Sequence, residues 1–155
     1  MSAVEAKPLG QYPWWIRLFF RKQRWTYGKV LDPGLMWARS PKVFASVALL
    51  YGALDRRSSP LPPALRALVT VRVSQINRCA FCVDINSATL LRRGIAMEKV
   101  DALPRWRDSN LFGADERLAL EYAEAMTLSG AGVQDDLRAR LAQRWPAGSC
   151  RLLAT

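Results

Sequence analysis

The 155 residues of this chain are enough for one domain with its own hydrophobic core, so folding needs no disulfide framework. Three cysteines argue against a secreted disulfide scaffold. The apolar runs are well short of the roughly 20 residues that cross a bilayer, which argues against a membrane span, and the N-terminal sequence MSAVEAKPLG lacks the pattern of a signal peptide. A net charge of +10 could attract nucleic acid or anionic lipid, but the chain has no nucleic-acid motif and no block of five basic residues. We expect a cytoplasmic protein that binds neither nucleic acid nor membranes.

Apolar residues first recur at helical spacing in the first quarter of the chain. They predict an amphipathic helix, rich in basic and aromatic residues, from Trp14 to Trp25. Its apolar stripe comprises Trp15, Leu18, Phe19 and Trp25, and its basic stripe comprises Arg17, Arg21 and Arg24. The sequence LDPG at 31–34 predicts a turn. A mostly apolar helix follows from about Lys42 to Leu54, with Pro41 at its first position.

The middle of the chain combines a loop, a helix and a cysteine pair. DRRSSPLPP at 55–63 is predicted to be a loop, and Pro63 to Ile76 a helix. Its buried stripe is expected to contain Leu65, Leu68, Val69, Val73 and Ile76. Asn77 and Arg78 interrupt the helix, and the next one opens at Cys79 and ends at Gly94.

Three further helices are predicted in the last third of the chain. They run from Met97 to about Leu103, from a cap at Asp115 to Thr127, and from Asp135 or Asp136 to about Trp145. In the second of these we expect Glu116, Arg117, Glu121 and Glu124 outward and Leu118, Tyr122, Ala125 and Met126 inward. No segment shows convincing strand alternation, so the predicted fold class is all-α.

The stretch around Cys79 and Cys82 carries the only recognisable chemistry, in a chain without histidine. A thiol at a helix N-terminus is stabilised as a thiolate, so the pKa of Cys79 should fall below the usual value of about 8.5. Cys82 follows one turn later on the same face, at a spacing that permits a disulfide, and Asn86 continues that face. Two small buried side chains remain an alternative. A zinc site needs four ligands and is disfavoured, because the chain offers only Cys150 as a third thiol and no histidine. Cys150 itself is interpreted as incidental.

The sequence resembles the carboxymuconolactone decarboxylase superfamily, in its alkylhydroperoxidase D-like branch. The resemblance lies in LPPALRALVTVRVSQINRCAFCVDINSATLLRRG, MEKVDAL and ERLALEYAEAMT, and extends from about Gly28 to Thr127. It implies an alkylhydroperoxidase D-like all-α bundle, a homo-oligomer, and reduction of organic peroxides through two cysteines without a cofactor or metal. By this resemblance Cys82 meets the peroxide, and Cys79 resolves it as a disulfide.

Three departures from the antioxidant pattern stand out. That pattern places a Glu twelve residues before the first cysteine and a His four residues after the second, where this chain has Ala67 and Asn86. Neither side chain can carry a proton at neutral pH, so the proton relay is absent. The chain also stops after PAGSCRLLAT, where such proteins continue into another apolar helix, which suggests an atypical or truncated C-terminus.

The leading functional hypothesis is an alkylhydroperoxidase-like dithiol oxidoreductase, a peroxiredoxin-type antioxidant peroxidase made weak by the missing relay. Its expected partners are an organic hydroperoxide or another small-molecule substrate, an unknown thiol reductant and further copies of itself. The alternatives are a non-catalytic oligomeric helical scaffold and a carboxymuconolactone decarboxylase-like carboxy-lyase. The expected organisation is an aromatic, basic segment at 1–27, the family domain at 28–145 and an irregular tail at 146–155.

Overall fold

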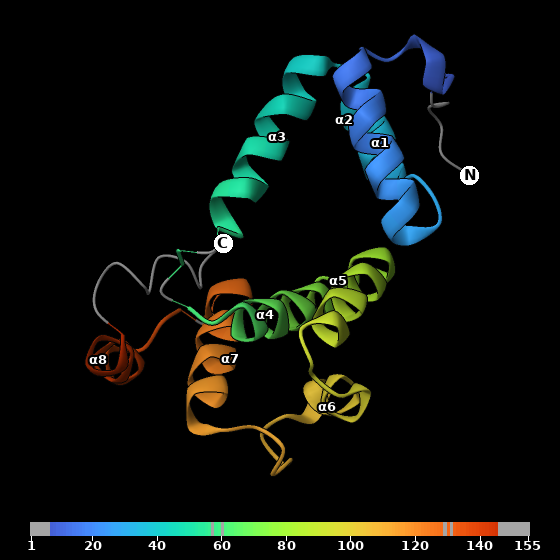
Figure 1. Ribbon diagram of the computed structural model, residues 1–155. Helices are drawn as coiled ribbons and strands as arrows, with labels where there is room; N and C mark the ends of the chain where they lie inside the picture. The colour runs from blue at the N-terminus through green and yellow to red at the C-terminus, as the bar shows by residue number, and fades with distance from the viewer. Residues whose placement is uncertain (1–6, 57, 60, 129, 131, 146–155) are drawn as a thin grey trace. The chain divides into compact units, whose positions relative to one another are not determined.

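The computed structural model describes residues 7–56, 58–59, 61–128, 130 and 132–145 (Figure 1). Every regular element of these residues is helical, which confirms the predicted all-α class. The elements are η1 (Leu9–Gln11), α1 (Trp14–Tyr27), α2 (Asp32–Ala38), α3 (Pro41–Leu54), α4 (Pro63–Ile76), α5 (Ala80–Arg92), α6 (Met97–Ala102), η2 (Leu103–Arg105), α7 (Ala114–Thr127) and α8 (Asp135–Arg144). The expected tail at 146–155, with Cys150, lies outside the described residues.

The chain divides into two compact units, of which the first ends at Leu54 and the second begins at Asp55. In the first, α1, α2 and α3 pack around a cluster of Tyr12, Ile16, Phe20, Ala38 and Phe44. The predicted stripe on α1 was wrong, because Leu18 and Trp25 are 50% and 90% exposed. The predicted turn at 31–34 was also wrong: these residues open α2, where proline in the first turn loses no helical hydrogen bond.

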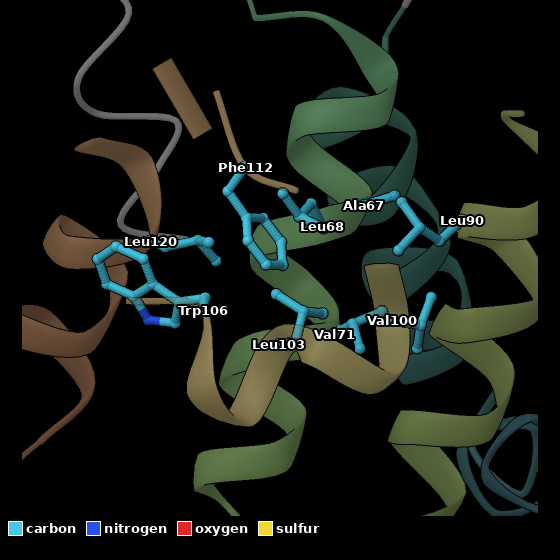
Figure 2. Packing of buried hydrophobic residues seen from close by; sticks show 9 residues of the cluster. All are labelled: Ala67, Leu68, Val71, Leu90, Val100, Leu103, Trp106, Phe112 and Leu120. Carbon is cyan, nitrogen blue, oxygen red and sulfur yellow. The ribbon is translucent and has the colours of Figure 1, made fainter. Parts of the chain in front are cut away.

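Helix α4 is the centre of the second unit and packs against both α5 and α7. One cluster holds Ala67, Leu68, Val71, Leu90, Val100, Leu103, Trp106, Phe112 and Leu120 (Figure 2). The other holds Leu61, Leu65, Val69, Ala119, Ala123, Leu137, Leu141 and Trp145. Because α4 contributes to both clusters, it is buried on more sides than the single predicted stripe implied.

Helix α7 differs from its prediction in its cap and in its buried face. Gly113 is the N-cap rather than Asp115, and its backbone N–H donates to Glu116 Oε2 at 2.9 Å. The buried residues are Ala119, Leu120, Ala123 and Glu124. The predictions that Met126 points inward and Glu124 outward were both wrong, since Met126 is 49% exposed and Glu124 is buried.

None of the helices in the described part of the chain combines the length and the apolar character needed to cross a membrane.

Candidate redox site

Cys79 and Cys82 lie together at the start of α5. Their sulfur atoms are joined at 2.09 Å, and their Cα atoms are 5.2 Å apart, within the usual range for a disulfide. Cys79 is the N-cap of α5, and its Sγ accepts a hydrogen bond from the backbone N–H of Cys82 at 3.3 Å. Both residues are half-buried, so the pair sits at the positive end of a helix and remains accessible to a small molecule.

The turn between α4 and α5 determines where Cys79 lies. The N–H of Cys79 donates to the carbonyl of Ser74, and the N–H of Arg78 donates to the carbonyl of Gln75, both at 3.1 Å. These two bonds form a Schellman motif, whose left-handed position is usually a glycine. Here it is Arg78, with φ of +53°. The end of α4 and the beginning of α5 are therefore one hydrogen-bonded unit.

Asn86 contacts α4 through a buried serine. Its Nδ2 donates to Ser74 Oγ at 3.2 Å, and that hydroxyl donates to the carbonyl of Thr70 at 2.7 Å. Ser74 thus holds Asn86 through its side chain and Cys79 through its backbone. The sequence analysis missed Ser74, although a polar residue on the same helix face as Ala67 and Val71 was the signal that could have identified it.

Ala67, where the antioxidant pattern has a glutamate, lies in the core and not in a polar site. It is 5% exposed and belongs to the cluster that includes Leu68, Val71 and Leu90 (Figure 2). The two positions of the absent relay therefore have different roles here: position 67 supplies apolar packing, and position 86 links α5 to α4.

A second cluster of polar side chains lies around the buried Glu124 of α7. Its Oε1 accepts from the indole Nε1 of Trp106 at 2.9 Å and from Nε of Arg72 at 2.7 Å, and its Oε2 accepts from Arg107. Burial by itself raises the pKa of this carboxyl, but the hydrogen bonds from Trp106, Arg107 and Arg72 outweigh it, so the pKa lies below its usual value of 4.5. Arg72 belongs to α4, so its ion pair with Glu124 links α7 to that helix.

The described residues contain no group of three or more histidine, cysteine, aspartate or glutamate side chains placed to hold a metal ion.

Comparisons with known proteins identify the family of this chain. Residues 41–125 match the carboxymuconolactone decarboxylase family. The chain is 43% identical over 144 residues to the uncharacterized protein YnjA of Escherichia coli (strain K12), covering 90% of this chain and 77% of YnjA.

Two solved structures share the fold. One is the alkylhydroperoxidase AhpD core of a peroxidase-related protein from Ralstonia eutropha JMP134, with a TM-score of 0.85 and 19% identity over 97% of this chain and 80% of that one. The other is the debrominase Bmp8, with a TM-score of 0.83 and 20% identity over 99% of this chain and 82% of that one. By sequence match this chain belongs to the carboxymuconolactone decarboxylase family, and it shares the fold of the AhpD core.

Proposed function

We propose that the protein is an alkylhydroperoxidase-like dithiol oxidoreductase that reduces a hydroperoxide and is oxidised to the Cys79–Cys82 disulfide. The observation that carries the proposal is the position of the pair at the N-terminus of α5, with Cys79 as the N-cap and Cys82 one turn later on the same helix. The helix dipole favours a thiolate there without a neighbouring base. A half-buried position also allows a small oxidant to reach the sulfur atoms.

The reaction takes two steps on the protein. The Cys82 thiolate attacks the terminal oxygen of the hydroperoxide, so that an S–O bond forms, the O–O bond breaks, and an alkoxide leaves and takes a proton from water. The Cys79 thiol then displaces water from the Cys82 sulfenic acid and forms the disulfide. A cellular dithiol returns both cysteines to thiols, which suits a reducing compartment such as the cytoplasm.

The absence of an acid–base side chain at positions 67 and 86 makes this a slow peroxidase. General acid–base catalysis contributes roughly 10²–10⁴ in rate, and Ala67 and Asn86 supply none of it. The same absence weighs against a carboxy-lyase, which needs such groups for its chemistry.

The reduced protein should lose both thiols of the pair together when it is treated with tert-butyl hydroperoxide. A Cys150→Ser background leaves only this pair, and alkylation followed by mass spectrometry counts the remaining thiols. With Cys79→Ala, oxidation should stop at a sulfenic acid on Cys82 that dimedone traps. If hydroperoxide leaves both thiols intact while diamide still oxidises them, the pair is not a peroxide site, and the scaffold hypothesis gains support.

We also propose that the protein forms a homo-oligomer. AhpD-like proteins are generally oligomeric. Helix α3 buries only Phe44, while Leu49, Leu50 and Tyr51 are 75%, 56% and 62% exposed. Large apolar side chains exposed to this extent on one helix are typical of an interface between proteins.

Light scattering should therefore give a mass that is a multiple of 17.4 kDa. The double change Leu49→Lys with Leu50→Glu should lower that mass, because it places charges on the proposed interface. The conservative change Leu49→Met should leave the mass unchanged. A wild-type protein that remains a monomer at all concentrations would refute the proposal.

A further inference from the structure

The amide group of Asn86 has one defined orientation. Ser74 Oγ lies 2.7 Å from the Thr70 carbonyl oxygen, and because a carbonyl cannot donate, the single hydroxyl hydrogen of Ser74 lies between them. Ser74 can then only accept from Asn86, so the Asn86 atom that faces Ser74 at 3.2 Å is the donor Nδ2. Ser74 is 7% exposed, which keeps water from competing for this hydrogen bond. The carbonyl oxygen Oδ1 of Asn86 therefore points away from Ser74.

That oxygen is available to a ligand. Within the part of the chain that the structure describes, no residue donates a hydrogen bond to Asn86 Oδ1, and the atom is not among the buried polar atoms without a partner. Asn86 is half-buried and lies four residues after Cys82, one helical turn along α5. The site thus presents a hydrogen-bond acceptor, with no proton to give, one turn from the reacting cysteine.

We propose that Asn86 Oδ1 accepts a hydrogen bond from the O–H of a hydroperoxide and so holds its terminal oxygen against Cys82. The proposal rests on the proposed function. In R–O–O–H the oxygen attacked by the thiolate carries the hydrogen, so an acceptor one helical turn from Cys82 can position the reacting atom. The hydrogen stays on that oxygen in the sulfenic acid, and Asn86 neither gains nor loses a proton. The preferred substrate class is hydroperoxides, over oxidants that lack a hydrogen-bond donor.

Two oxidants separate this role from a structural one. Diamide oxidises a dithiol but has no N–H or O–H group, whereas tert-butyl hydroperoxide has one. With reduced protein in the Cys150→Ser background, Asn86→Leu should slow disulfide formation by tert-butyl hydroperoxide about tenfold, the usual effect of one hydrogen bond, and leave the rate with diamide within about twofold. Rates are measured by quenching with an alkylating reagent at timed intervals.

Two further variants make the result specific to the Ser74–Asn86 pair. Ser74→Ala keeps the acceptor but releases the amide from α4, so it should give a smaller loss with tert-butyl hydroperoxide and none with diamide. Thr89→Val removes a hydroxyl from the same helix, whose partners among the described residues are Ile85 and Arg92, and should change neither rate.

The possible failures are distinguishable. Equal slowing with both oxidants in Asn86→Leu would show that Asn86 only maintains the cysteine geometry, and no slowing with either would show that it has no role; each result overturns the inference and leaves the proposed function intact. A wild-type protein that reacts with diamide but not with tert-butyl hydroperoxide would overturn the proposed function and the inference together.

Discussion

Replacing Asn86 by histidine is expected to raise the rate of peroxide turnover about 100-fold, the lower end of the range for general acid–base catalysis. One nitrogen of a histidine at this position can donate to Ser74 Oγ, while the other takes the proton of the Cys82 thiol and, from the resulting imidazolium, returns it to the leaving alkoxide. Asn86 has the hydrogen bond to Ser74 but no proton to transfer. Turnover is measured as consumption of tert-butyl hydroperoxide with excess dithiothreitol as the reductant.

The controls test whether the gain comes from the dithiol. Cys82→Ala should abolish turnover in both the wild-type and the Asn86→His backgrounds. Adding Ala67→Glu should raise the rate further only if its carboxylate forms a hydrogen bond with the new histidine. Position 67 lies among Leu68, Val71 and Leu90, where a charged group without a partner is unfavourable. If the unmodified protein turns over peroxide as fast as Asn86→His, another group moves the proton, and the relay argument is wrong.

Replacing Glu124 by leucine should lower the free energy of unfolding by about 3–5 kcal/mol, the usual effect of removing one partner of a buried ion pair. The Arg72 side chain is 16% exposed and would lose its carboxylate at Oε1. The buried indole N–H of Trp106 would also lose its acceptor. Urea unfolding at neutral pH, followed by tryptophan fluorescence or circular dichroism, measures the change.

Glu121, one helical turn earlier on α7, offers a matched control. Its carboxylate pairs with Arg140, but both side chains are far more exposed than Glu124, at 34% and 43%. Glu121→Leu should therefore cost less than about 1 kcal/mol. Similar losses in the two variants would show that Glu124 contributes no more than a surface ion pair.

The pH dependence of stability provides a second readout for Glu124. Its pKa is lower in the folded protein than in the unfolded chain, so its contribution is fully present above the unfolded pKa and is lost as the pH falls through the folded pKa. The free energy of unfolding should fall in the wild type below about pH 5. Glu124→Gln keeps the shape of the side chain but does not titrate there, so its loss of stability over the same interval should be smaller.

Much of the local structure could be predicted from the sequence alone. The predicted bounds of α4, Pro63 and Ile76, match the structure, and the interruption at Asn77 and Arg78 is confirmed. Apolar spacing, prolines and glycines act within one or two turns of the chain, so the positions of helices and their ends can be predicted without knowledge of the fold. The position of Cys79 at the start of α5 follows from the same local signals.

Only the tertiary structure decided which helix faces are buried. On α1 the side chains of Ile16 and Phe20 are buried and that of Trp25 is exposed, although all three are apolar. On α7, Glu124 is buried because Arg72, Trp106 and Arg107 come from elsewhere in the chain to satisfy its carboxylate.

The same limit applies to the candidate site. The sequence by itself determined the cysteine pair, the absence of histidine and the apolar residue at position 67. It could not show that Ser74 lies against Asn86, since these residues are twelve positions apart on different helices. A hydrogen bond between helices depends on how the helices pack, and packing depends on the whole core rather than on any local pattern. The direction of the Asn86 amide was decided by that packing.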